Sequence, residues 1–279
     1  MLNQETIKKI EQFVCSKPRS IQEIALHINK NWRTADRYVS EIEKEFGTIA
    51  TRVFRGGTRG ALKIAFWASV EKASNSAFQE QLEKQIIRGR TKFEFSPFDI
   101  FQHIPDNKKD ARIEHGKDET TTTLEDLKNF LQQAKKQLLI FSGNLSFINF
   151  KNEAINIFSI IEELGKKGVS MKVLSRVDIA GKDNIDKLLS LNFKQGKENI
   201  EIRHSEQPLR AVVVDNKLFR MKEIKESTGR KNELGEKTFI FYTIKDKEWA
   251  EWLSKIFWKM FSSSIGSSRR LTEMKKFHS

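Results

Sequence analysis

The hydrophobic positions of the first 67 residues predict three short helices. Apolar side chains recur on one face of the opening segment, and this pattern ends near Pro18. Ser20 can cap a second helix, because Glu23 stands three residues later as its capping-box partner. After a polar break at residues 29–31, a third helix turns apolar side chains inward at helical spacing. These side chains are Ala35, Val39, Ile42 and Phe46.

Two strand patterns follow the helices, over residues 49–53 and 61–67, and a glycine-rich loop at residues 54–60 joins them. No carboxylate occurs between Glu45 and Glu71, so the hairpin is a concentrated positive charge that phosphates would neutralise. Its basic residues are Arg52, Arg55, Arg59 and Lys63. Three helices followed by a basic hairpin are typical of a winged helix-turn-helix. We therefore predict a DNA-binding domain over residues 1–68.

The third predicted helix carries the side chains best placed to reach base edges, because the amino-terminal half of this helix enters the major groove in such domains. They are Asn31, Trp32, Arg33, Thr34 and Arg37. The alternative is a small domain that binds only proteins, in which Trp32 and Tyr38 merely pack against neighbouring elements. We favour packing for Tyr38 and DNA binding for the domain.

The regular spacing of hydrophobic residues weakens between residues 69 and 123. We interpret this segment as a helical bridge and a flexible linker. The sparse apolar series over residues 69–88 fits a bridging or dimerising helix and a solvated linker helix equally well. Residues 91–123 contain two proline sites, a charge-dense stretch and a run of threonines, which are typical of a loop. Their phenylalanine cluster, from Phe93 to Phe101, is too apolar for a spacer and is expected to dock on one of the domains.

Helical and strand patterns alternate from Leu124 onward, which predicts an α/β domain with a mixed sheet over residues 124–262. The closing helix, over residues 245–261, repeats Trp and Phe at helical spacing and should cover much of the sheet. For the basic tail at residues 263–279 we favour a disordered end over a phosphate-binding arm.

Composition narrows the class of protein. The chain has 279 residues with 50 Lys and Arg against 37 Asp and Glu, a formal charge of +13 that favours nucleic acid as a partner. It has no apolar run long enough to span a membrane, so we expect a cytoplasmic protein. The single cysteine, Cys15, is expected to be a buried, inert thiol. The 5 histidines show no metal-ligand spacing, and we expect no metal and no cofactor.

The second half of the chain resembles a phospholipase D half-domain. The resemblance lies in the order of its elements and in the segments LLIFSGN at residues 138–144 and RAVVVDNKLFRM at residues 210–221. The same domain follows a winged helix in TrmB-like archaeal transcription regulators. That resemblance implies an effector and dimerisation domain, with a sugar-like molecule as a possible effector.

The catalytic motif of phospholipase D enzymes, H-x-K-x4-D, is incomplete in the matching window. Asp215 fits and Arg210 keeps the positive charge, but Pro208 occupies the position of the nucleophilic histidine. His204 lies four residues too early to replace it. We therefore expect a dimeric, sequence-specific transcription regulator without catalytic activity. The alternative is a phospholipase D-like nuclease or phosphodiesterase that the winged helix delivers to DNA.

Overall fold

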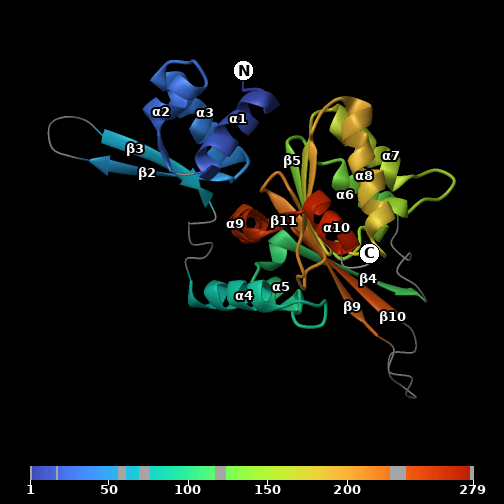
Figure 1. Cartoon of the computed structure of the whole chain (residues 1–279). Helices are drawn as coiled ribbons and strands as arrows, with labels where there is room; N and C mark the ends of the chain where they lie inside the picture. The colour runs from blue at the N-terminus through green and yellow to red at the C-terminus, as the bar shows by residue number, and fades with distance from the viewer. Residues whose placement is uncertain are drawn as a thin grey trace.

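The computed structural model of the chain describes residues 2–16, 18–55, 61–68, 76–116, 124–226 and 237–276. These residues form a small N-terminal domain of helices and a hairpin, beside a large α/β domain (Figure 1). The fold class expected from the sequence, α/β with N-terminal helices and a large mixed sheet, is confirmed.

The N-terminal domain has the predicted order of elements. They are α1 (Gln4–Ser16), β1 (Arg19–Ser20), α2 (Ile21–His27), α3 (Trp32–Glu45), β2 (Ile49–Arg55) and β3 (Ala61–Trp67). The capping box at the start of α2 is present, because Glu23 N donates to Ser20 Oγ (3.2 Å) and Ser20 N donates to Glu23 Oε2 (2.7 Å). The short strand β1 was not predicted, and it pairs with the middle of β3.

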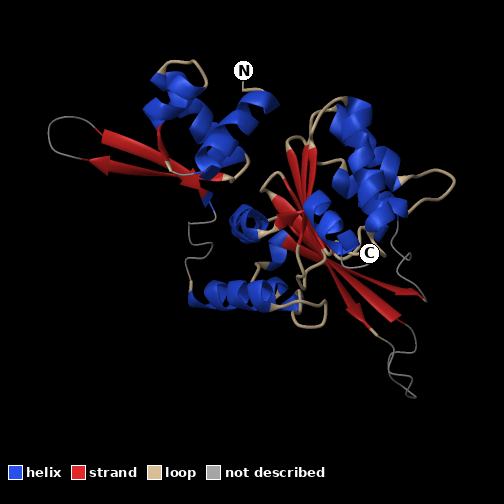
Figure 2. Ribbon diagram, in the orientation of Figure 1, coloured by secondary structure: helices blue, strands red, loops and turns tan. Residues whose placement is uncertain are grey.

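The described part of the large domain contains one large sheet, drawn in red in Figure 2. Its strand order is β11-β7-β6-β5-β8-β9-β10-β4. Strands β5, β6 and β7 run parallel, and the other pairs are antiparallel. All of β5 is buried, as expected for a central strand with both faces covered. The strands are β4 (Lys109–Gly116), β5 (Gln137–Ser142), β6 (Ser170–Ser175), β7 (Ile200–His204), β8 (Ala211–Val214), β9 (Leu218–Lys225), β10 (Lys237–Ile244) and β11 (Ile265–Gly266).

Helices cover both faces of this sheet (Figure 1). One face carries α6 (Leu124–Leu131), the 3-10 turn η3 (Ser146–Asn149), α7 (Ile157–Lys166) and α8 (Lys182–Gln195). The other face carries α4 (Ala77–Arg88), α5 (Phe98–Phe101) and α9 (Lys247–Ser263). As predicted, the Trp- and Phe-rich helix α9 packs its buried face on the sheet. The remaining elements are the 3-10 turn η2 (Asp106–Lys108) and α10 (Ser267–Lys276).

The predicted helix over residues 69–88 is present as α4, but the predicted flexible linker over residues 91–123 is wrong where α5 and β4 form. Helix α4 packs on α9, and β4 pairs with β10 along its whole length, from Lys109 opposite Ile244 to Gly116 opposite Lys237. The segment folds because β10 offers it a free sheet edge, which its local sequence does not reveal. The expectation that the phenylalanine cluster docks is confirmed for Phe95 and Phe101, which pack in or against the α9 core, whereas Phe93 and Phe98 are exposed. Residues 69–75 and 117–123 lie outside the described residues.

Two further expectations are corrected. The tail is ordered over residues 265–276, where β11 pairs with the end of β7 and α10 follows. Residues 277–279 lie outside the described part of the chain. Cys15 is exposed, because its neighbour Val14 occupies the inward position in the last turns of α1.

Candidate nucleic-acid interface

The start of α3 is fixed by a capping residue and a buried stripe. Asn31 Oδ1 accepts a hydrogen bond from Thr34 N (2.9 Å), which satisfies one free N–H group of the first turn. The inward face buries Ala35, Val39 and Ile42 together with Tyr38, so the packing role favoured for Tyr38 is confirmed. This burial leaves the opposite face of the helix to solvent.

Three of the five predicted base-reading side chains lie on that outer face. Trp32 is 55% exposed, and Arg33 and Arg37 are also exposed. The Arg33 guanidinium lies 5.6 Å from the Trp32 ring centroid, and that of Arg37 lies 5.3 Å from the Tyr38 ring centroid. Such contacts orient a guanidinium and leave its N–H donors available. Neither arginine forms an ion pair with a carboxylate of the described residues.

The other two predicted base-reading residues have structural roles. Asn31 uses its carbonyl oxygen in the cap, and Thr34 is half-buried behind it. Both stay within the first turn of α3, so they flank the exposed side chains.

The predicted phosphate contacts of the hairpin divide into three cases. Lys63 Nζ donates to Asp36 Oδ1 (2.7 Å) and Ser40 Oγ (3.0 Å), so its charge is paired and ties β3 to α3. Arg52 and Arg55 lie on β2, in register with residues 64 and 61 of β3. The structure describes their backbone and not their side chains. Arg59 lies outside the described residues altogether.

The carboxyl-terminal end of α3 is bonded to the large domain, which sequence reasoning missed. Phe46 O accepts hydrogen bonds from Gln137 Nε2 (3.0 Å) and Trp258 Nε1 (3.1 Å). Glu45 O accepts one from Asn216 Nδ2 (3.4 Å). The last carbonyl groups of a helix lack partners within it, and these side chains supply them. The available signal was a polar residue, Gln137, at the head of an otherwise apolar strand.

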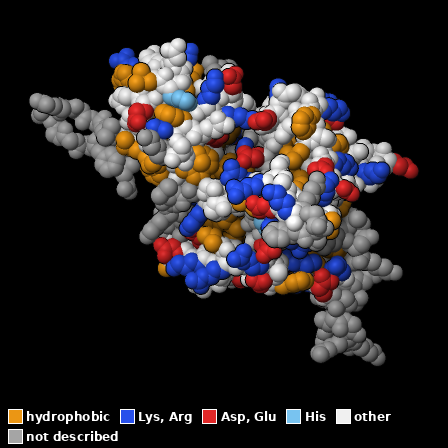
Figure 3. Space-filling view, in the orientation of Figure 1, with side chains coloured by type: hydrophobic (Ala, Val, Ile, Leu, Met, Phe, Trp, Pro, Cys, Tyr) orange, Lys and Arg blue, Asp and Glu red, His pale blue; other side chains and the backbone are white. Residues whose placement is uncertain are grey.

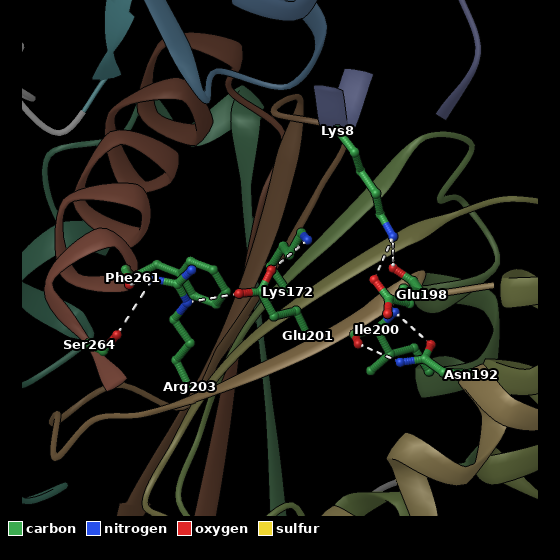
Figure 4. A network of polar contacts seen from close by, with 9 residues as sticks. All are labelled: Lys8, Lys172, Asn192, Glu198, Ile200, Glu201, Arg203, Phe261 and Ser264. Atoms are coloured by element: carbon green, nitrogen blue, oxygen red, sulfur yellow. Dashed lines mark hydrogen bonds and ion pairs between the residues drawn. The ribbon is translucent and has the colours of Figure 1, made fainter. Parts of the chain in front are cut away.

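Helix α1 makes a second contact between the domains. Lys8 Nζ donates to Glu198 O (2.6 Å) and lies 3.5 Å from Glu198 Oε2 (Figure 4). Nearby, Glu201 lies between Lys172 and Arg203, at 2.9 and 2.8 Å. Burial opposes ionisation of Glu201, but these two cations together hold the pKa of its carboxyl below the ordinary value. The N-terminal domain is therefore attached through both α1 and α3.

The residues at the phospholipase D motif positions make separate contacts in the fold. Pro208 is buried, and Arg210 lies half-buried at the start of β8. Asp215 Oδ1 accepts hydrogen bonds from Lys136 N and Gln137 N, and its Oδ2 accepts one from Lys135 N, each at 2.9 Å. This carboxylate joins the β8–β9 turn to the start of β5.

His204 and Arg210 lie at the ends of separate strands of the sheet. His204 ends β7, and strands β6 and β5 lie between β7 and β8, which separates the two strands by about 14 Å. Its Nδ1 accepts a hydrogen bond from Val177 N (3.0 Å), so this nitrogen already has a partner.

Basic and acidic side chains are intermixed over the visible face of the large domain (Figure 3). No helix in the described ranges has the length and apolar character needed to cross a membrane.

Comparison with known proteins gives only structural similarity, because no family model and no curated protein sequence matches the chain. The chain is similar to Nuc, a phospholipase D family member from Salmonella typhimurium, with a TM-score of 0.39 and 11% identity over 56% of this chain and 98% of Nuc. NucT from Helicobacter pylori gives a TM-score of 0.39 and 12% identity, over 57% of this chain and 99% of NucT.

The similarity to TrmBL2 extends over both domains. For this archaeal chromatin protein, whose structure is described as showing a novel mode of DNA binding, the TM-score is 0.34 and the identity 16%, over 92% of this chain and 91% of TrmBL2. Because these TM-scores lie under 0.5, function has to be inferred from this chain's own residues.

Proposed function

We propose that the chain is a sequence-specific transcription regulator that binds duplex DNA, with residues 1–68 acting as a winged helix-turn-helix. The outer face of α3 carries this proposal, because Arg33 and Arg37 lie exposed there beside Trp32. Arginine is the commonest specific partner of guanine in the major groove. The two guanidinium groups are one helical turn apart, so both can face the same groove.

The attachment of α3 supports a role in recognition. Its far end is bonded to the large domain through Phe46 O, while its first turn is capped from within the N-terminal domain by Asn31. A helix that is already held in position loses less conformational freedom when it docks in a groove. The large domain would thus set the direction in which α3 points.

In this proposal the large domain is not catalytic. Pro208 has no nucleophile, Asp215 accepts three backbone hydrogen bonds, and His204 Nδ1 is bonded to Val177 N. The regulator would act in the cytoplasm as a homodimer, with two α3 helices about 34 Å apart in successive major grooves. A sugar-like effector stays a prediction.

Selection from a random duplex pool at two salt concentrations, followed by fluorescence anisotropy on the recovered sequence, tests DNA recognition. A pseudo-palindromic motif is expected, as is tighter binding at the lower salt concentration. Arg33→Ala and Arg37→Ala should each weaken binding by about 1–3 kcal/mol, roughly 5- to 150-fold. Arg176→Ala, a 56% exposed arginine on the large domain, is the matched control. Unchanged binding in both α3 variants would contradict the proposal.

Cleavage assays on duplex and single-stranded DNA test the absence of catalysis. We expect no turnover by the wild type. Cleavage that is lost in Arg210→Gln would replace this proposal by the nuclease alternative, since Arg210 stands at the lysine position of the motif.

A further inference from the structure

A cavity of about 140 Å³ lies at the carboxyl-terminal end of β5, on the face of the sheet that carries α6 and η3. Its floor is formed by β5, β8, β9 and β10, and its walls by α6 and η3. Four phenylalanine rings line it: Phe130, Phe147, Phe150 and Phe241. The ring of Phe141 packs on Phe257 of α9, on the other face of the sheet. An apolar cavity of about 150 Å³ accommodates a benzene ring. The size and the lining therefore suit one six-membered aromatic ring.

The cavity also has a positive wall. Arg210, Arg220 and Lys222 line it, and no carboxylate is among its described lining residues. Arg220 is engaged by Asp126 at 2.8 and 3.2 Å, which lowers its value as a ligand for an anion. The Lys222 ammonium lies 4.4 Å from the centroid of the Phe239 ring. Arg210 is the cation that lies directly against Gly143, at the strand end that lines the cavity.

Gly143 makes room for the Arg210 guanidinium. A Cβ atom added to Gly143 would lie 2.6 Å from Arg210 Nη2 and 3.0 Å from its Cζ, so any larger residue would displace this group. Arg210 Nη1 donates to Leu209 O (2.8 Å), which anchors one side of the guanidinium. A guanidinium has five N–H donors and pairs well with a planar carboxylate. The strand end and the arginine therefore form one built wall of the cavity.

The uncharged polar residues of the lining are too few and too committed for a sugar. They are Ser142, Asn144 and Ser146. Ser142 Oγ accepts from Leu145 N (3.1 Å), and Asn144 Oδ1 accepts from Ser146 N (3.2 Å). Each buried sugar hydroxyl needs a hydrogen-bond partner, and an unpaired one is costly. An aromatic body with a single anionic group makes no such demand.

We propose that this cavity binds a small aromatic carboxylate, with its ring among the phenylalanines and its carboxylate on Arg210. This site goes beyond the DNA-binding proposal and does not depend on it. Strands β5 and β8 connect the cavity to the end of α3, because Gln137 begins β5 and Asn216 follows β8. An occupant therefore contacts the two strands that also hold the recognition helix.

Isothermal titration calorimetry on the full-length protein without DNA tests the site. The probes are benzoate, phenylacetate and 4-hydroxybenzoate, with benzamide as the uncharged isostere of benzoate and glucose and maltose as sugars. We expect binding of at least one carboxylate. Benzamide should bind at least about tenfold more weakly than benzoate, because its contact with Arg210 lacks the charge. Because no DNA is present, failure here is distinct from failure of the DNA-binding proposal.

Two variants locate the site. Arg210→Gln should weaken carboxylate binding by about tenfold or more, whereas Arg269→Gln, a 76% exposed arginine on α10, should leave it unchanged. Ser146→Phe should abolish binding by filling the cavity. Ser146 bonds to Asn144 through its backbone N–H, which the substitution keeps, so this variant tests the site even if Arg210→Gln does not fold. No carboxylate binding by the wild type, undiminished binding in the folded variants, or tighter binding of a sugar would overturn the proposal.

Discussion

Replacing Asp215 by Asn tests whether this motif position now serves the fold. The substitution keeps the size of the side chain and changes only its charge and one acceptor atom. The backbone tolerates it, because Asp215 has a φ of 51°, in the left-handed region that Asn also adopts readily. Any loss of stability therefore reports on the hydrogen bonds of the carboxylate.

The magnitude follows from those bonds. If the amide oxygen takes the place of Oδ1, it keeps the bonds from Lys136 N and Gln137 N, but these become neutral and weaker. The amide nitrogen then faces Lys135 N–H, so one bond to a charged acceptor, worth about 1.5–3 kcal/mol, is lost. Together the free energy of unfolding should fall by about 2–4 kcal/mol.

Urea denaturation followed by tryptophan fluorescence and by circular dichroism measures this change. Asp178→Asn is the matched control, because Asp178 is partly exposed and accepts bonds from Gly181 N and Arg176 Nε, each at 2.8 Å. The Asp178→Asn substitution should lower the free energy of unfolding by less than about 1 kcal/mol. A loss under about 0.5 kcal/mol for Asp215→Asn, the range of an ordinary surface change, would refute the structural role of this carboxylate.

Three further predictions concern other contacts. Trp258→Phe removes the indole donor to Phe46 O, so the free energy of unfolding should fall by about 1 kcal/mol in urea titrations, because a second donor remains on that carbonyl. Equal stability of this variant and the wild type would count against the attachment of α3. Lys63→Met should weaken DNA binding in anisotropy titrations less than Arg33→Ala does, because the Lys63 ammonium is already paired with a carboxylate. Burial, with Arg270 nearby, lowers the pKa of His204, so below about pH 6.5 the unfolded chain binds more protons at this residue than the folded chain. The stability that neutral His204 provides is therefore lost as pH falls through its lowered pKa. Between pH 7.5 and 5, the free energy of unfolding of His204→Gln should fall less than that of the wild type. The same pH dependence in both proteins would contradict this.

Most helices and strands could be predicted from local patterns. The inward positions of α3, such as Val39 and Ile42, recur within one or two turns, and the capping box of α2 spans four residues. Signals of this kind depend on neighbours in the chain and are visible without a fold. The prediction failed at β4 because an edge strand gains its order from its partner, and β10 lies far along the chain.

The residues of the candidate site likewise include some that the sequence predicts and some that only the packing of the fold brings together. The sequence by itself determined which side chains of α3 face outward, because helical periodicity places Arg33 and Arg37 opposite the buried stripe. Only the tertiary structure decided that Lys63 is paired with Asp36, 27 residues away, and that Trp258 holds the end of α3 across 212 residues. It also decided that Arg210 lies over Gly143 beside an aromatic cavity. Such contacts depend on how the domains and strands pack together, and packing brings together residues whose separation in sequence carries no local signal.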